Sequence, residues 1–263
     1  MHRANKNMSR HIGKCALVIA LATLLLIASC ATTRVDEGQT MSYISMGLAY
    51  LQAGDSTSAL REFMEAEKRN PDDPAVHYYL GIAYYMKGIK EEAIRQFEKA
   101  IELKPDYSEA RNYLGTVYLE SGSHDKAIEE FQRVLTNILY ETPALTIYNL
   151  GRAYYEKGDY DASLSYFRQA LEKQPTISIL PHIYHYIGLV YLNENRVDDA
   201  LHYFQKSLEI APSMIESRLQ SGICHMKKGD TPRAAKEFRK VIETAPESKP
   251  AMAAAHYLQS LGE

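Results

Sequence analysis

One glycine returns along the chain at nearly constant spacing, and this repetition limits the fold more than any other feature. The intervals between successive copies are 34, 34, 36, 37 and 34 residues. The six glycines are Gly47, Gly81, Gly115, Gly151, Gly188 and Gly222. A period of this length is typical of stacked units in which no single unit buries its apolar face alone. We therefore expect an all-α array of similar units rather than one globular core.

Two further positions recur in every repeat and predict how its helices pack. If the glycine is counted as position 8, position 20 holds a small residue and position 24 holds phenylalanine. The small residues are Ala59, Ala93, Ala127, Ser163, Ala200 and Ala234, and the phenylalanines are Phe63, Phe97, Phe131, Phe167, Phe204 and Phe238. We expect the glycine and the small residue to let the two helices of a repeat approach closely. The phenylalanine is expected to fill the seam to the next repeat.

Residues typical of turns and of helix ends recur in the repeats. A residue that tolerates a positive φ angle is expected after the first helix, and a proline is expected to stop the second. The turn residues are Gly54, Gly88, Gly122, Gly158, Asn195 and Gly229, and the prolines are Pro71, Pro105, Pro175, Pro212 and Pro246. The whole pattern resembles the tetratricopeptide repeat (TPR). The resemblance implies a right-handed superhelix of six helix-turn-helix repeats with a C-terminal capping helix.

Two junctions break the 34-residue period. The segment "LTNILYETPALTIYNLG" carries two extra residues before the fourth glycine, and Leu139 stands where proline is expected. The segment "KQPTISILPHIYHYIG" carries three extra residues before the fifth glycine. Such insertions lengthen a helix or its outgoing turn. We therefore expect the array to bend at these points into two three-repeat halves.

The N-terminal segment has the pattern of an export signal. Four basic residues precede an apolar run over residues 15–28 that ends in "LLLIASC"; they are Arg3, Lys6, Arg10 and Lys14. The run is shorter than the roughly 20 apolar residues that a spanning helix needs. A basic start, a short apolar stretch and small residues at its end are typical of a secretory signal. An uncleaved signal anchor is the alternative.

The cysteine that ends this run predicts a lipid anchor. Leu26 to Cys30 resembles the bacterial lipobox, in which a peptidase cuts before the cysteine. The resemblance implies that Cys30 carries a diacylglycerol and an acylated amino group, and several chains on one residue make a durable anchor. By analogy with enteric lipoproteins, Ala31 and Thr32 after the cysteine favour the outer membrane. No other cofactor is expected.

These signals predict four segments. Residues 1–29 are the removed lipoprotein signal peptide, and residues 30–39 are the lipidated cysteine with a flexible spacer. Residues 40–247 hold the six repeats, at about 40–73, 74–107, 108–143, 144–180, 181–214 and 215–248. Residues 248–263 include "KPAMAAAHYLQSLGE" and are expected to form the capping helix that such arrays need.

In TPR arrays, positions 2, 5, 9 and 12 of the first helix face the concave groove, and the last three of these positions predict the binding surface. Repeats one and two are apolar there, whereas repeats three and four are mixed. The groove residues are Ile44, Leu48, Leu51, Tyr78, Ile82, Tyr85, Asn112, Tyr148, Arg152 and Tyr155. A protein helix laid in the groove is the expected ligand. The alternative is that some of these side chains only pack against neighbouring helices.

One known binding mode does not fit. Chaperone-binding TPR domains present lysine, arginine and asparagine at positions 5, 6 and 9 to hold a C-terminal carboxylate, whereas Ile44, Ser45 and Leu48 stand there in repeat one.

Residues that could support catalysis or metal binding lack partners in the sequence. His182 and His185 could share a helix face, but no third ligand is nearby. Cys224 is followed by His225, yet adjacent helical residues point in different directions. The net charge of −3 gives no reason to expect nucleic acid. We predict no enzyme, no metal site, no nucleic-acid partner and no small-molecule substrate.

The combination of these features resembles one family. A lipobox, a brief spacer, six repeats, a cap and the irregular segment around Leu139 and Tyr140 resemble the PilF/PilW family of type IV pilus pilotins. The resemblance implies a periplasmic, lipid-anchored protein that binds secretin subunits and helps them reach the outer membrane and assemble. The alternative is a TPR lipoprotein scaffold of the outer-membrane protein assembly machinery or of peptidoglycan enzymes.

Overall fold

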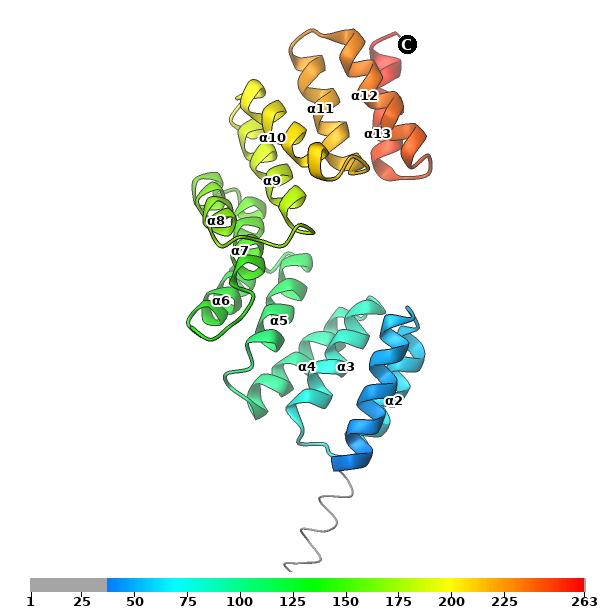
Figure 1. The fold of residues 1–263 in the computed structure, drawn as a ribbon, viewed down its shortest axis with the longest axis vertical. Coiled ribbons are helices and arrows are strands. Elements are labelled where there is room, and N and C mark those ends of the chain that lie inside the picture. The colour runs from blue at the N-terminus through cyan, green and yellow to red at the C-terminus, as the bar shows by residue number, and fades with distance from the viewer. Residues whose placement is uncertain (1–36, 263) are drawn as a thin grey trace, which may run out of the picture. The chain divides into compact units, whose positions relative to one another are not determined.

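The computed structural model describes residues 37–262, and this part of the chain contains helices and no strand (Figure 1). A first helix covers residues 37–52. The others are α2 (Ser56–Arg69), α3 (Pro74–Met86), α4 (Lys90–Leu103), α5 (Ser108–Glu120), α6 (His124–Leu135), α7 (Pro143–Lys157), α8 (Tyr160–Glu172), α9 (Leu180–Asn193), α10 (Val197–Ile210), α11 (Ile215–Lys227), α12 (Thr231–Thr244) and α13 (Lys249–Ser260). The predicted all-α class is confirmed.

Each repeat is a helical hairpin closed by the glycine at position 8 and the phenylalanine at position 24. A Cβ atom added to the glycines of repeats two to six would lie only 2.6 or 2.7 Å from the phenylalanine ring of the same repeat. Real Cβ atoms do not approach a ring so closely, so only glycine fits. All six phenylalanines are fully buried. The predicted close approach of the two helices is confirmed, and the phenylalanine ring is what occupies the space beside the glycine.

The same phenylalanines also reach the next repeat, as expected. Phe63 stacks on Tyr79 and Phe167 on Tyr186, each with 5.6 Å between ring centroids. In the last repeat Phe238 stacks on Tyr257 of α13 at 5.1 Å. The C-terminal helix therefore continues the packing of the array at the position where a seventh repeat would begin.

The turn between the helices of a repeat needs a positive φ angle. Gly158 ends α7 at a φ of 83° in the left-handed region. Asn195 occupies the equivalent place in repeat five at 59°. Asparagine is the residue other than glycine that most readily adopts this conformation. The predicted substitution of asparagine for glycine is confirmed.

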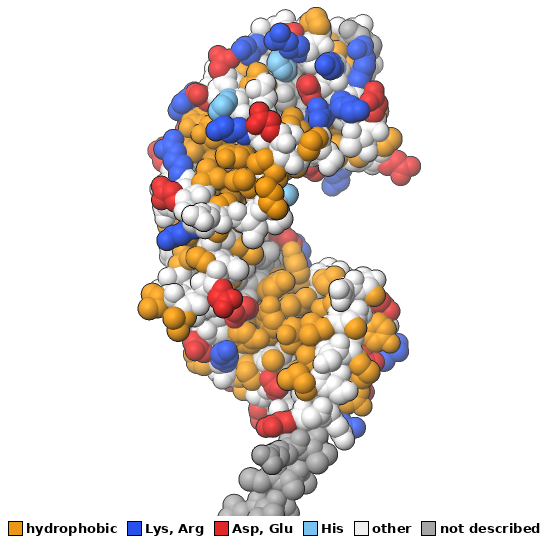
Figure 2. Space-filling view, in the orientation of Figure 1, with side chains coloured by type: hydrophobic (Ala, Val, Ile, Leu, Met, Phe, Trp, Pro, Cys, Tyr) orange, Lys and Arg blue, Asp and Glu red, His pale blue; other side chains and the backbone are white. Residues whose placement is uncertain are grey.

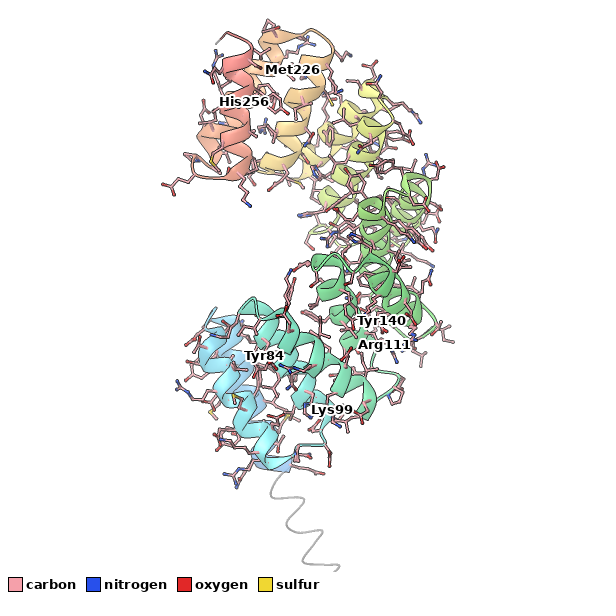
Figure 3. All side chains as sticks on the ribbon, turned by 180° about the vertical axis from the view of Figure 1, so that it is seen from behind. Tyr84, Lys99, Arg111, Tyr140, Met226 and His256 are labelled. Carbon is pink, nitrogen blue, oxygen red and sulfur yellow. The ribbon has the colours of Figure 1, made fainter. Side chains whose placement is uncertain are left out.

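A polar clasp that was not predicted from the sequence joins positions 4 and 23 in three of the repeats. The pairs are His77 with Gln96 at 2.7 Å, Arg111 with Glu130 at 2.8 Å, and Arg218 with Glu237 at 2.8 Å. His77 and Arg218 also bond to the carbonyl oxygens of Pro71 and Pro212, each at 2.7 Å. Arg111 lies at the start of α5 (Figure 3). Each clasp ties the two helices of its repeat together.

The helices group into two compact units. Unit 1 runs to Ala110 and contains repeats one and two; unit 2 begins at Arg111 and contains repeats three to six and α13. The insertions in the sequence had predicted a division into two halves of three repeats each. The buried Thr146 hydroxyl instead donates to Asn112 Oδ1 at 3.0 Å, which links repeats three and four within unit 2. The extra residues are accommodated outside, since Leu139 is 83% exposed.

We predict that Gly188→Ala destabilises unit 2 by about 2 kcal/mol, because the added methyl overlaps the Phe204 ring in a filled core. Urea unfolding followed by far-ultraviolet circular dichroism measures the change. Gly188→Ala combined with Phe204→Leu removes the overlapping ring edge. The double variant should lose less stability than the sum of the two single changes. Simple additivity would contradict the proposed contact.

Candidate protein-binding site

Five of the six predicted groove residues of unit 1 keep accessible surface, and the sixth, Ile44, is buried. Leu48 is 38% exposed, and Leu51, Tyr78, Ile82 and Tyr85 are half-buried. Leu48 and Leu51 come from the helix at residues 37–52, and the other three come from α3. These five side chains present apolar surface from both repeats of unit 1.

Three of the six groove residues in unit 1 also serve its packing. Ile44 is only 3% exposed and belongs to the core of unit 1, and the half-buried Leu51 packs against that core. The Tyr78 ring lies 5.1 Å from those of Tyr79 and Tyr107 and 6.3 Å from that of Phe97. The alternative reading of these positions, packing against neighbouring helices, therefore describes Ile44 well.

Unit 1 also exposes large apolar side chains that the groove positions did not include. Figure 2 shows hydrophobic side chains gathered over unit 1 on the face in view. Besides Leu48, the exposed residues of this unit are Met41, Met46, Tyr50, Met64, Met86 and Ile89. Four of these six are methionines. Methionine is flexible and polarizable, so it adapts to partners of different shape and is common at binding surfaces.

Tyr50, at position 11 of repeat one, is 41% exposed. In repeats four and five the tyrosine at this position stacks on a tyrosine at position 23, as Tyr154 does on Tyr166 with 5.2 Å between centroids. Repeat one has Glu62 at position 23 and offers no such ring. In repeat two, Tyr84 packs half-buried against the core of unit 1 (Figure 3).

The groove positions of unit 2 carry a different chemistry. Asn112 and Tyr148 are each 7% exposed, and Asn112 is occupied by its bond to Thr146. Arg152 lies over the rings of Tyr148 and Tyr186, with its guanidinium carbon 5.7 and 5.8 Å from their centroids. Tyr155 lies 5.5 Å from Tyr186, between ring centroids. Unit 2 therefore gathers an arginine and three tyrosines.

The two irregular junctions meet in one cavity of unit 2, of about 260 Å³. It is lined by residues 141–145 from the first junction and by residues 173–176, 178 and 179 from the second. Gln174 lines it with a φ of 52°, which is unusual for a residue other than glycine or asparagine. Ile138 and Ile177 on the same loops are 93% and 72% exposed. The sequence identified each insertion but not that they line the same cavity.

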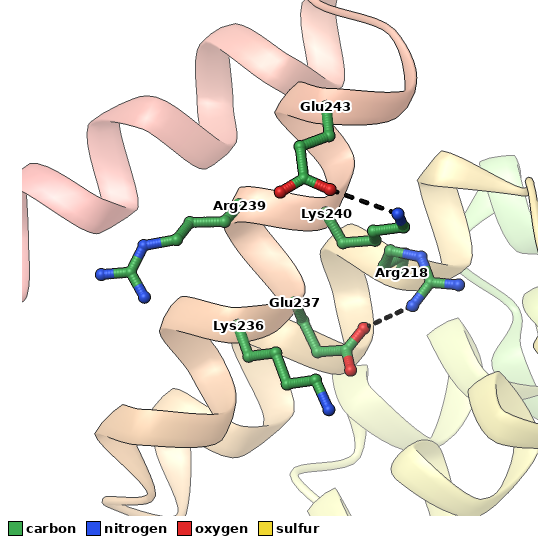
Figure 4. A pocket seen from close by; sticks show the side chains of 6 residues that line it. All are labelled: Arg218, Lys236, Glu237, Arg239, Lys240 and Glu243. Atoms are coloured by element: carbon green, nitrogen blue, oxygen red, sulfur yellow. Dashed lines mark hydrogen bonds and ion pairs between the residues drawn. The ribbon is translucent and has the colours of Figure 1, made fainter.

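A second cavity, of about 380 Å³, lies on α11 and α12 (Figure 4). It is lined by Arg218, Lys236, Glu237, Arg239, Lys240 and Glu243. Its two carboxylates are already engaged, since Arg218 bonds to Glu237 at 2.8 Å and Lys240 to Glu243 at 3.2 Å. The exposed pair of Lys240 and Glu243 contributes little to stability, whereas the Arg218–Glu237 pair is largely buried. The surface has four basic and two acidic side chains, and two of the basic ones are paired with the two carboxylates.

The two histidines considered as metal ligands have different surroundings, and the cysteine considered as a nucleophile is buried. His182 is exposed and bonds to the Ser178 carbonyl, whereas His185 is buried and bonds to Ser217 Oγ at 2.9 Å. Within residues 37–262 no group of three or more His, Cys, Asp or Glu side chains is placed to hold a metal ion. Burial raises the pKa of the Cys224 thiol to about 12, which keeps the thiol protonated.

The anchor lies outside the described part of the chain. Cys30 precedes residue 37, so its lipidation and the signal peptide stay predictions. None of the helices between residues 37 and 262 has the length and apolar character needed to cross a membrane.

Three family models match the chain, and each describes a tetratricopeptide repeat. One matches residues 44–108 and 148–215, the second residues 106–175, and the third residues 191–256. The matched segments join into a continuous stretch from residue 44 to residue 256. A search of curated protein sequences finds no match.

Solved structures share the fold at low sequence identity. PilW, described as a widely conserved type IV pilus biogenesis factor, gives a TM-score of 0.75 at 18% identity, covering 82% of this chain and 98% of its own. PilF of Pseudomonas aeruginosa gives 0.71 at 18% identity, covering 84% and 99%. The Cut9–Hcn1 hetero-tetramer of the APC/C gives 0.74 at 17% identity, covering 86% and 43%.

We predict that His185 makes unit 2 sensitive to acid. Burial, with a smaller effect of His182, lowers the pKa of His185 from its ordinary 6.5 to about 4. The unfolded chain therefore binds the proton first, and stability that is complete above pH 6.5 falls as the pH drops toward 4. Between pH 7 and pH 5 the loss from this residue is about 2 kcal/mol.

Urea unfolding at the two pH values measures this loss. His185→Gln should reduce the dependence on pH by that amount, whereas the exposed control His182→Gln should leave most of it. An unchanged dependence in His185→Gln would show that other groups cause the acid sensitivity.

Proposed function

Because the chain belongs to the tetratricopeptide repeat family, we propose that it is a non-catalytic adaptor that binds secretin subunits during type IV pilus assembly. TPR arrays are scaffolds that bind other proteins. Two observations support secretin as the specific partner. The sequence resembles the pilotins, and the fold is similar to those of PilW and PilF.

One observation carries the proposal: the extent of the structural match. Nearly the whole of PilW and PilF is covered, at 98% and 99%, whereas only 43% of the similarly folded Cut9–Hcn1 chain is covered. An array of the same size as theirs supports an equivalent role better than a generic stretch of repeats would.

The surface of unit 1 supplies the means of binding. Its apolar groove residues and its exposed methionines present a surface that a partner helix can cover. Burying such side chains contributes roughly 25 cal/mol per Å² of apolar area, a gain that offsets the entropy lost on association. We assign the secretin contact to this surface of unit 1.

The anchor completes the proposal. We propose that lipidated Cys30 holds the adaptor at the periplasmic face of the outer membrane, the membrane for which its client is destined. The alternative function is a lipoprotein scaffold of the outer-membrane protein assembly machinery or of peptidoglycan enzymes. No feature of the described surface favours it over the secretin role.

The first test compares outer membranes from cells with the normal chain, a deletion, and Cys30→Ala. We expect the heat-resistant secretin oligomer to be lost in the deletion and lost or mislocalised in Cys30→Ala, as measured by immunoblot. An unchanged oligomer in the deletion would exclude the secretin role and direct attention to the alternative partners.

The second test concerns the surface of unit 1. Leu48→Glu places a charge at a groove position that is already partly exposed, so the fold should tolerate it. We expect the affinity of the full chain for purified secretin subunits to fall by about tenfold, because the charge must be desolvated on binding. Met252→Glu, at a 63% exposed site on α13, is the matched control and should bind normally. Equal affinities of the two variants would place the contact elsewhere.

A further inference from the structure

Arg152 in α7 is a half-buried arginine that forms no ion pair with a carboxylate among residues 37–262, although the charge of Glu120 acts on it. The other arginines of similar burial are paired: Arg111 with Glu130 and Arg218 with Glu237, each at 2.8 Å. A charge removed from water without a counter-ion is costly to hold. The contrast within one chain makes the environment of Arg152 unusual.

The repeat scaffold does not require a charge at this place. Position 9 carries Leu48, Ile82, Thr116, Arg152, Leu189 and Ile223 in the six repeats. All six belong to hairpins closed by the same glycine and phenylalanine. An uncharged residue therefore satisfies the fold at this position in five of the six repeats, and the packing of the array does not explain the charge.

The surroundings hold the guanidinium without saturating it. The rings of Tyr148 and Tyr186 lie within cation–π distance, and the Tyr186 hydroxyl also accepts a hydrogen bond from the guanidinium. Nη1 donates to Asn149 Oδ1 at a long 3.4 Å. Nε is buried and has no hydrogen-bond partner. Arginine has five N–H donors in a fixed fork, so several of its bonds remain to be made.

The guanidinium of Arg152 keeps its positive charge in these surroundings. Burial acts to lower the pKa of Arg152, but Tyr148, Tyr186 and Glu120 outweigh it, so the pKa is raised. Asn193 Nδ2 donates to the Tyr155 hydroxyl at 3.1 Å, which leaves the proton of that hydroxyl as a further donor. The group formed by Arg152, Tyr155 and Tyr186 is therefore rich in donors and poor in acceptors.

We propose that this group, the Arg152 site, binds the carboxylate of an aspartate or glutamate side chain in the partner polypeptide. A carboxylate matches the arginine fork with two parallel hydrogen bonds and neutralises its charge. Groove positions continue in the repeats before and after Arg152, so a bound segment extends past the site on both sides. This favours an internal side chain over a chain terminus. The proposal rests on the proposed protein-binding function and adds the chemistry of one contact.

The test uses the full-length chain in detergent and random dodecapeptides displayed with blocked C-termini. We expect the bound peptides to be enriched in aspartate and glutamate. Changing the acidic residue of a bound peptide to its amide should lower the affinity by about tenfold, as fluorescence anisotropy measures. Against Arg152→Gln the same change should alter the affinity by less than about twofold.

Arg168→Gln is the matched control, since Arg168 is an exposed arginine that also bonds to a tyrosine hydroxyl, that of Tyr191 at 3.1 Å. Its affinity should fall by the same factor as that of the normal chain when the acidic residue of the peptide is changed to its amide. Thermal unfolding should show that both variants are folded. No acidic enrichment, or an undiminished effect in Arg152→Gln, would overturn the proposal. Binding that appears only when the same peptides are given free C-termini would overturn the choice of an internal side chain. The test does not involve secretin, so its failure would leave the secretin immunoblot to decide the proposed function separately.

Discussion

The contact between the glycine at position 8 and the phenylalanine ring at position 24 determines the rest of the structure. It fixes the distance between the two helices of a repeat, because the ring fills the space that any Cβ atom would need. The same ring stacks on an aromatic residue of the next repeat, as Phe63 does on Tyr79. One side chain thus sets both the shape of the hairpin and its seam. The first helix of each repeat consequently presents its positions 5, 9 and 12 in a constant way.

Because this contact is constant, other positions vary without loss of the fold. Positions 4 and 23 form a polar clasp in repeat three, through Arg111 and Glu130, and an aromatic pair in repeat five, through Tyr184 and Tyr203 at 6.1 Å. Both arrangements connect the same two helices. The groove positions vary for the same reason, apolar in unit 1 and tyrosine-rich around Arg152 in unit 2.

The parts of the structure that were predictable from sequence are those that repeat. Gly188 and Phe204, and the asparagine turn at Asn195, recur at fixed positions, so their roles could be inferred before any coordinates. The exposure of Tyr50 and the bond between Thr146 and Asn112 depend on which residue stands opposite in space, and one sequence does not give that. The cavity shared by the two insertions was missed because the residues that line it are distant in the chain and share no period.

The two surfaces would discriminate between partners by different physical means. The methionines of unit 1 adapt to many apolar shapes, so this surface offers affinity with little discrimination. Arg152 acts in the opposite way. A ligand that covers it without supplying an acceptor removes the remaining water from a charge that forms no ion pair and whose Nε has no hydrogen-bond partner, and this costs binding energy. Such a site contributes selectivity chiefly by penalising ligands that lack a carboxylate. An array built on one constant contact can therefore combine permissive and selective surfaces, since neither is needed to hold it together.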